Sequence, residues 1–221
     1  MSGRRKGGGE GWFRRTRWDP EIEAAFFDRL ARSRDPFHKA QYVRIQASHL
    51  EQTGADEHVE VALRLLDRLL AEWPEDLMRA EAHDQRARCL ARLGKSEEAV
   101  EAFRASFAAM RQVPGFVPTT AIDFGQFAVK LRRTDLYDEV ARVLDEFHND
   151  SPIHVMNFLR DSVLAIVEDH RGRRNVAAAH ARRALAAASA EHSGLRGRPR
   201  LGLVTNPDPV LIAEVRRIAR D

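Results

Sequence analysis

Four small or branched apolar residues recur at nearly even intervals, and this recurrence constrains the fold more than any other feature of the chain. Ala62, Ala99, Val140 and Ala177 are separated by 37, 41 and 37 residues, and each lies in an amphipathic segment of its own. Such a period is typical of helical repeat proteins, in which each helix pair buries its apolar face only against neighbouring pairs. The chain is therefore expected to form a helical solenoid, an architecture that usually binds partners rather than catalysing reactions.

Local signals divide the sequence into helices. Asp-Pro pairs at 19–20, 35–36 and 208–209 place a capping carboxylate before a proline that suits the first helical turn. Glycines at 54, 94 and 172 mark turns after apolar runs, and Asp135 is a candidate cap between two later helices.

These signals predict an all-α fold. Helices are expected at about 20–33, 36–51, 57–72, 77–93, 96–111, 119–132, 136–148, 152–169, 175–190 and 209–218. The last of them should bury Val210, Leu211, Val215 and Ile218 on one side. The only candidate strand, Leu201 to Thr205, has no partner with which to pair.

The helix pairs resemble tetratricopeptide repeats (TPR), whose 34-residue pattern places small and large residues at fixed positions. The matching positions are Ala62, Leu66 and Pro74 in the first pair; Ala87, Leu90, Gly94, Ala99 and Phe103 in the second; Phe124, Phe127, Ala128, Leu131, Val140, Leu144 and Pro152 in the third; and Leu164, Ala165, Gly172, Ala177, Ala181 and Ala184 in the fourth. The resemblance covers about residues 36–190. It implies a right-handed α-α superhelix of about four helix hairpins, with capping helices at its N- and C-terminal ends.

The expected organisation has three parts. Residues 1–17 should be a disordered basic tail, because they include a Gly7-Gly8-Gly9 run and few apolar side chains. Residues 18–192 should form the repeat domain. Residues 193–221 should hold an extended Gly/Arg/Pro-rich connector, over 193–206, and a short capping helix.

The TPR resemblance also implies a concave face, lined by the first helix of each pair, that holds an extended peptide or a helix of a partner. The positions projected onto this face are Gln41, Arg44, Ser48 and Glu51 in the first pair, Glu81, Asp84 and Arg88 in the second, Ile122, Gly125, Val129 and Arg132 in the third, and Ser162 and Ile166 in the fourth. This lining would be charged at one end and apolar at the other.

The N-terminal tail carries a charge of its own. Residues 1–18 have a net charge of +5, from Arg4, Arg5, Lys6, Arg14, Arg15 and Arg17 against Glu10, whereas the whole chain has +3. Trp12, Phe13 and Trp18 lie among these basic residues. Two interpretations follow: the segment binds nucleic acid or an anionic surface, or its aromatic rings dock on the first hairpin and cover its open apolar edge.

Motifs for chemistry are missing from the sequence. No HExxH motif, zinc-type Cys/His spacing or nucleophile elbow occurs, and the single cysteine, Cys89, falls inside an expected helix. No run of 18 uncharged apolar residues and no signal-peptide pattern is present. We therefore expect a cytoplasmic, non-enzymatic protein without metal or cofactor and without a transmembrane segment.

The expected function is a protein-protein interaction module, a scaffold that holds a peptide or protein in the groove. One alternative is nucleic-acid or anionic-surface binding through Arg4–Trp18, which salt would weaken steeply. Another is a regulatory or immunity-type protein that sequesters one specific partner. Exposed apolar edges at either end of a short solenoid could also drive formation of a homodimer.

Overall fold

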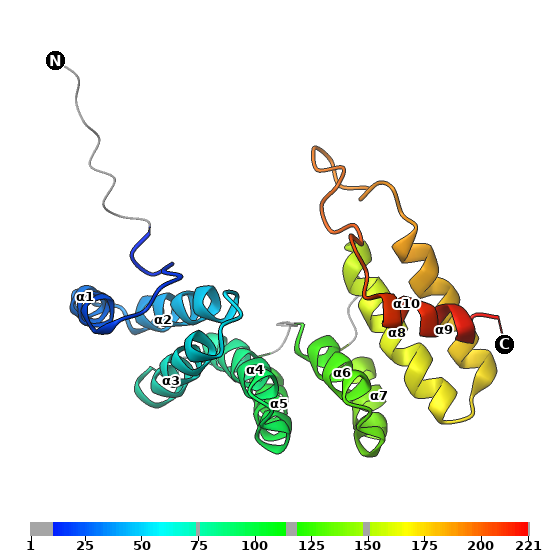
Figure 1. Cartoon of the computed structure of the whole chain (residues 1–221), viewed down its shortest axis with the longest axis horizontal. Coiled ribbons are helices and arrows are strands. Elements are labelled where there is room, and N and C mark those ends of the chain that lie inside the picture. The colour runs from blue at the N-terminus through cyan, green and yellow to red at the C-terminus, as the bar shows by residue number, and fades with distance from the viewer. Residues whose placement is uncertain (1–10, 74–75, 114–118, 148–150, 221) are drawn as a thin grey trace. The chain divides into compact units, whose positions relative to one another are not determined.

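The protein is all-α in the computed structural model, which describes residues 11–73, 76–113, 119–147 and 151–220 (Figure 1). These ranges contain no β-strand, so the candidate strand at Leu201–Thr205 does not form. The helices are α1 (Pro20–Ala31), α2 (Pro36–Glu51), α3 (Asp56–Glu72), α4 (Asp76–Arg92), α5 (Ser96–Gln112), α6 (Thr120–Lys130), η1, a 3-10 helix (Thr134–Leu136), α7 (Tyr137–Glu146), α8 (His154–His170), α9 (Arg174–Ala188) and α10 (Pro209–Ile218). All ten predicted α-helices are confirmed, and their ends differ from the prediction by at most two residues. Pro74, expected to close the first repeat, lies outside the described residues.

The helices group into two compact units. Residues 1–120 hold α1 to α5, and residues 121–221 hold α6, apart from its first residue, to α10. In the first unit α2 packs against α3, α3 against α4, and α4 against α5. In the second unit α8 and α9 pack side by side and α10 contacts both (Figure 1). The expected repeat domain, 18–192, includes residues of both units, and the expected connector and capping helix, 193–221, lie in the second unit.

Three helices begin at the predicted capping carboxylates. The Oδ1 atom of Asp19 accepts from the Ile22 amide at 2.8 Å, and that of Asp35 accepts from the Phe37 amide at 3.0 Å. Asp208 accepts from the amide of Val210 in the same way, at 2.8 Å. These bonds satisfy amides that have no partner inside the helix, so the start of each helix is fixed locally by the sequence.

The turn after α6 departs from the glycine turns elsewhere in the chain. The Lys95 amide donates across Gly94 to the Leu90 carbonyl at 2.9 Å, and the Arg133 amide donates to the Ala128 carbonyl at the same distance. Arg132 therefore occupies the place of a C′ glycine, with φ of 52°. Asp135 does not cap α7, contrary to the prediction. It lies in η1 and pairs with Arg133 at 2.8 Å, because the extra 3-10 turn displaces the start of α7.

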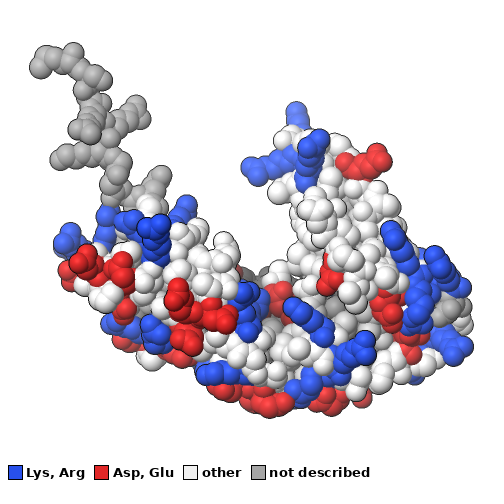
Figure 2. All heavy atoms as spheres, in the orientation of Figure 1, with Lys and Arg blue, Asp and Glu red and all other residues white. Residues whose placement is uncertain are grey.

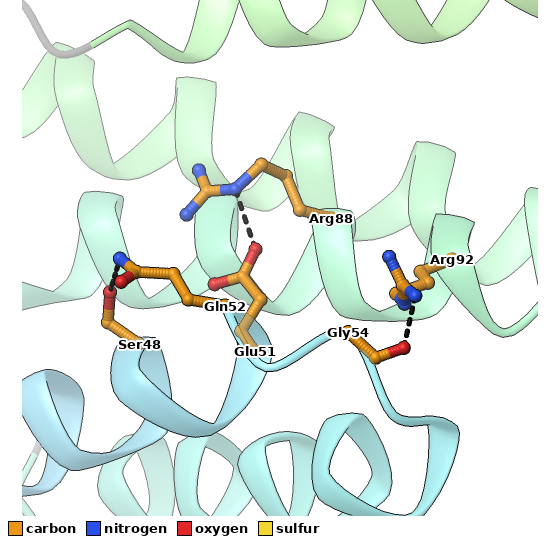
Figure 3. Close-up of a pocket in the computed structure, with 6 residues that line it drawn as sticks. All are labelled: Ser48, Glu51, Gln52, Gly54, Arg88 and Arg92. Atoms are coloured by element: carbon orange, nitrogen blue, oxygen red, sulfur yellow. Dashed lines mark hydrogen bonds and ion pairs between the residues drawn. The ribbon is translucent and has the colours of Figure 1, made fainter. Parts of the chain in front are cut away.

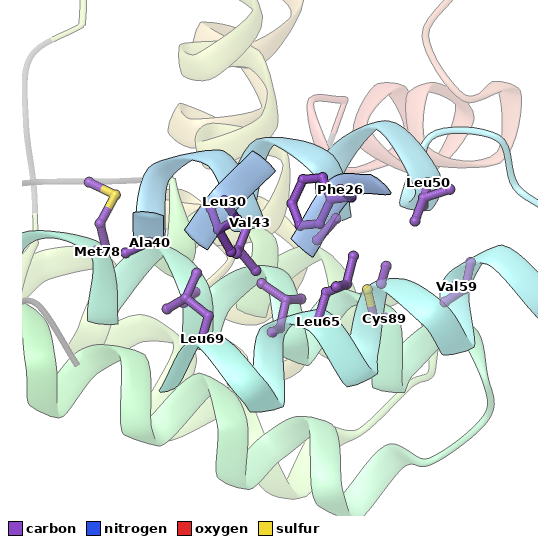
Figure 4. Packing of buried hydrophobic residues seen from close by; sticks show 14 residues of the cluster. Phe26, Leu30, Ala40, Val43, Leu50, Val59, Leu65, Leu69, Met78 and Cys89 are labelled. Atoms are coloured by element: carbon purple, nitrogen blue, oxygen red, sulfur yellow. The ribbon is translucent and has the colours of Figure 1, made fainter. Parts of the chain in front are cut away.

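The core of the first unit forms between α1, α2, α3 and α4 (Figure 4). Its buried side chains include Phe26 and Leu30 from α1, Val43 and Leu50 from α2, Leu65 and Leu69 from α3, and Met78 and Cys89 from α4. The repeated Ala62 and Ala99 are both completely buried. A small residue at such a position lets two helices approach closely, and the larger side chains fill the space beside it.

The core of the second unit is rich in alanine. Ala177, Ala181 and Ala184 of α9 are completely buried, and Val215 and Ile218 of α10 pack in the same cluster. The predicted burial of Val210 is wrong, since it is 78% exposed, and Leu131, a large position of the repeat pattern, is 45% exposed. Each lies near a helix end, where the neighbouring helices no longer cover the apolar face.

Residues 193–206 were expected to be an extended connector but form a compact loop. The Ser193 amide donates to the Pro199 carbonyl at 2.8 Å, and the Val155 amide at the start of α8 donates to the Gly202 carbonyl at 2.8 Å. Glycines with positive φ at 194, 197 and 202 allow the tight turns that these bonds require. Within the described ranges, no helix has the length and apolar character needed to cross a membrane.

Candidate functional site

A face of the first unit combines charged side chains from α2 and α4, which pack against each other. Spacings of three and four residues place Arg44, Ser48 and Glu51 along one side of α2, and Glu81, Asp84 and Arg88 along one side of α4. These six residues belong to the set predicted from the sequence, and the ion pairs that follow bring most of them together. We call them, with the pocket residues named below, the α2–α4 face.

Ion pairs connect the two helices across this face. Arg44 Nε lies 3.2 Å from Glu81 Oε2, and Arg88 Nε lies 3.0 Å from Glu51 Oε1. Arg88 also pairs with Asp84 within α4. The side chains of Glu51 and Asp84 are mostly buried, so water screens these pairs less than pairs on an open surface. The face is therefore held in a defined geometry.

A pocket of about 460 Å³ opens on the same face (Figure 3). Its lining comes from Ser48, Glu51, Gln52, Gly54, Arg88 and Arg92. Arg92 donates to the Gly54 carbonyl, and Gln52 Nε2 donates to Ser48 Oγ at 3.1 Å. The pocket thus presents two guanidinium groups, a carboxylate, an amide and a hydroxyl.

Three of the lining residues, Gln52, Gly54 and Arg92, were missed by the sequence reasoning. Arg92 follows Arg88 by one helical turn, so the spacing along α4 could have indicated it. Gln52 and Gly54 lie in the turn that leaves α2, where the helical projection no longer applies. Only the packing of that turn against α4 brings them to the pocket.

Two side chains of α4 beside the ion pairs, Gln85 and Cys89, are buried. Gln85 is 1% exposed, and neither its Nε2 nor its Oε1 has a hydrogen-bond partner among the described residues. The pKa of the Cys89 thiol is raised to about 12, because burial disfavours the thiolate and the Glu51 carboxylate adds to the effect. An unpartnered buried amide destabilises a fold by about 1–3 kcal/mol, so the burial of Gln85 does not improve stability.

The predicted groove residues of the second unit do not form a comparable polar face. Ile122 and Val129 are half-buried on α6, and Arg132 is exposed in the turn after it. Ile166 of α8 packs against the cluster that contains Val215 and Ile218 of α10. A position that the projection assigned to partner binding is therefore used in part for packing within the second unit. In the first unit, Gln41 is half-buried on α2.

The aromatic residues of the basic segment dock on the first hairpin. The Trp12 ring lies 5.2 Å from the Phe26 ring and 5.1 Å from the Tyr42 ring, and the Trp18 ring lies 5.5 Å from the Phe26 ring. Phe13 packs on Tyr42 at 4.8 Å. Residues 11–18 are therefore packed against α1 and α2 rather than part of a disordered tail.

The basic side chains of this segment face solvent. Arg14, Arg15 and Arg17 are exposed. Arg4, Arg5 and Lys6 lie outside the described residues. Since the aromatic rings are used in packing, the docked segment offers mainly its guanidinium groups to other molecules.

No metal site is built from the described side chains, since no group of three His, Cys, Asp or Glu residues is suitably placed within those ranges. The α2–α4 face instead offers paired charges and hydrogen-bonding groups around an open pocket. No known protein family, curated protein or solved structure matches this chain, so its function is inferred from the geometry of the molecule itself.

Proposed function

We propose that the chain is a TPR-like helical repeat module that binds a peptide segment of a protein partner on the α2–α4 face. Four consecutive helix pairs, α2/α3, α4/α5, α6/α7 and α8/α9, support the repeat assignment. Burial of the equivalent residues Ala62, Ala99, Val140 and Ala177 also supports it. In this proposal the pairs stack as a right-handed superhelix, α1 and α10 cap its ends, and the module is a non-enzymatic scaffold.

The observation that carries the proposal is the combination of ion pairs and a pocket on two adjacent helices. A volume of about 460 Å³ lies within the range of small-ligand and side-chain pockets in proteins, roughly 300–1,000 Å³. These ion pairs are partly buried and hold the guanidinium and carboxylate groups in place around the pocket. A peptide would therefore meet ordered side chains, which lowers the cost of ordering them on binding.

The lining indicates which peptide groups would bind. Arg92 makes its hydrogen bond to a neutral carbonyl, and its pairing with the exposed Asp56 is long, at 3.9 Å. A carboxylate of the partner would form a stronger, charge-assisted bond with this guanidinium. Ser48 and Gln52 can bond to the partner's backbone, and Glu51 can accept from a basic side chain. We therefore expect a peptide with both acidic and basic residues.

A pocket-filling substitution tests the proposal without breaking the ion pairs. A photo-crosslinking amino acid at Ser48 should yield one discrete protein adduct in cells, and the added variant Gln52→Trp should abolish it. Gln112→Trp, an equal substitution at an exposed residue of α5, should leave the adduct intact. Thermal unfolding of both variants shows whether the fold survives. The assignment of the face would be contradicted if both variants kept the adduct or if both lost it.

The same experiment bears on the other functions. The identity of the crosslinked protein would distinguish a regulatory or immunity-type role from that of a general scaffold. Binding of nucleic acid or an anionic surface by Arg4–Trp18 would depend on the basic groups, because Trp12, Phe13 and Trp18 pack on the first hairpin. Such binding would fall steeply with salt, whereas the α2–α4 face binds through shorter-range contacts. We also propose a cytoplasmic location, since the single cysteine is a buried thiol.

A further inference from the structure

The loop that joins α9 to α10 carries a second concentration of charge, in the other unit of the chain. Residues 192–207 contain Arg196, Arg198 and Arg200 and no acidic residue. The three arginines alternate with Gly197 and Pro199. The sequence Arg-Gly-Arg-Pro-Arg thus forms a short basic segment, which we call the arginine loop, 193–202.

Hydrogen bonds within and below the arginine loop fix its backbone. Ser193 is almost completely buried, and its Oγ donates to the Arg198 carbonyl at 2.6 Å while it accepts from the Leu195 amide at 3.1 Å. The Ser193 amide reaches the Pro199 carbonyl, which closes the loop at its base. At its far end, the Gly202 carbonyl accepts from the Val155 amide of α8. These hydrogen bonds hold the backbone of the loop in one conformation, unlike that of a flexible linker.

The arginine side chains have no role in this framework. All three are exposed, and within the part of the chain that the structure describes none forms an ion pair or a side-chain hydrogen bond. Figure 2 shows a group of basic side chains at the end of this loop. By contrast, Arg171 and Arg217 of the same unit pair with acidic residues. Three uncompensated like charges repel one another, so they do not stabilise the folded chain. A bound anion would be attracted to all three of them.

The tip of the loop is also unobstructed on one side. Gly197 has φ of 73°, and a Cβ atom added to it would meet nothing within 4 Å. The backbone at this point can approach a surface closely from the open side, with a guanidinium group before it and another after it. A glycine backbone between two exposed arginines is suited to the minor groove of B-DNA, which is about 6 Å wide. A·T tracts narrow this groove further and strengthen its negative potential, which attracts arginine.

We propose that the arginine loop binds the minor groove of A·T-rich duplex DNA, with Arg196 and Arg198 on either side of Gly197 entering the groove and Arg200 contacting a phosphate. Residues 192–207 contain no Phe, Trp or Tyr. Such rings are needed to stack on unpaired bases and are enriched at membrane interfaces, so their lack favours the duplex over single strands or lipid. The inference is independent of peptide binding by the α2–α4 face.

Fluorescence anisotropy with the full chain and two duplexes of about 20 base pairs, one an A·T tract and one G·C-rich, tests the proposal. The unmodified chain should bind the A·T tract more tightly, and a minor-groove drug such as netropsin should compete. The variant Arg196→Ala/Arg198→Ala/Arg200→Ala should lose on the order of tenfold in affinity and reduce the slope of log affinity against log salt by about three.

A charge-matched control separates the loop from the total charge. Arg174, Arg182 and Arg216 are exposed in the same unit and have no ion pair with the described residues. Their triple alanine variant should bind the A·T tract within about twofold of the unmodified chain. An equal loss in both triple variants, or equal affinity for the two duplexes, would overturn the proposal. Binding of an acidic peptide or anionic vesicles with no binding of DNA would also overturn it.

A substitution at the tip tests the shape requirement. Gly197→Asn adds a side chain without a large backbone penalty, because asparagine tolerates positive φ. It should weaken binding to the A·T tract while it preserves the charge and the thermal unfolding midpoint. The pocket-filling variant Gln52→Trp should bind DNA like the unmodified chain. A failure of DNA binding is thereby distinguished from a failure of peptide binding.

Discussion

The side-chain amide of Gln46 binds the backbone of Arg15 through both of its hydrogen-bonding groups. The Arg15 amide donates to Gln46 Oε1 at 2.9 Å, and Gln46 Nε2 donates to the Arg15 carbonyl at 2.7 Å. Gln46 is completely buried in α2, so these two bonds satisfy an amide that would otherwise have no partner. They fix residues 11–18 in the position that lets Trp12 and Trp18 reach the first hairpin.

Removal of this amide should release the N-terminal segment. We expect Gln46→Ala to lower the free energy of unfolding by about 2 kcal/mol, from two lost hydrogen bonds and lost packing. Tryptophan emission should shift to longer wavelength as Trp12 and Trp18 become hydrated. Urea unfolding followed by fluorescence measures both effects. Gln52→Ala, at an exposed position, is the control and should change stability by less than about 0.5 kcal/mol.

The turn after α6 should be improved by glycine. Arg132 has a positive φ, which costs a residue with a Cβ atom about 1 kcal/mol relative to glycine. Arg132→Gly should therefore raise the unfolding free energy by up to about 1 kcal/mol. Gly94 lies at the equivalent turn with φ of 75°, and a Cβ atom added there would meet nothing within 4 Å. Gly94→Ala should therefore lower the unfolding free energy by a similar amount. Thermal denaturation checks both, and opposite signs are required if the backbone is the cause.

The close approach of α6 to its neighbours should not tolerate a methyl group. A Cβ atom on Gly125 would lie 2.7 Å from Val163 Cγ1 and 3.4 Å from Val140 Cγ1. Gly125→Ala should therefore destabilise the protein by about 1–3 kcal/mol. The double variant Gly125→Ala/Val163→Ala should lose less unfolding free energy than the two single variants together, because the smaller side chain at 163 removes the clash. Strict additivity in denaturant unfolding would show that the two side chains do not meet.

The buried Cys89 thiol should resist modification and give the stability a pH dependence. Its pKa is raised by burial from about 9 to about 12, so the folded state holds its proton where the unfolded chain has lost it. Its contribution to stability is fully present below about pH 9 and is lost as the pH rises towards 12. Cys89→Ala should flatten the fall in unfolding free energy over this window. At pH 8, a thiol reagent should label Cys89 of the native protein only at the rate at which the fold opens around this side chain.

Much of the fold was predictable because its signals are local. The Asp-Pro pairs at 19–20, 35–36 and 208–209 fix helix starts through bonds to amides two or three residues away, whatever the rest of the chain does. The α2–α4 face was likewise predictable in part, since the helical period alone places Arg44 near Ser48 and Asp84 near Arg88. Asp135 misled the prediction because η1 inserts an extra turn that has no strong sequence signal.

Local signals were thus enough to predict the all-α class, most helix boundaries and which residues share a helix face. Tertiary structure alone decided that Glu51 meets Arg88, that Gly54 and Gln52 join a pocket with Arg92, and that Gln46 holds the backbone of Arg15. It also decided that Ser193 closes the arginine loop against Pro199. The physical reason is range: caps and helical periodicity act within a few residues, whereas these contacts depend on how separate helices and turns pack.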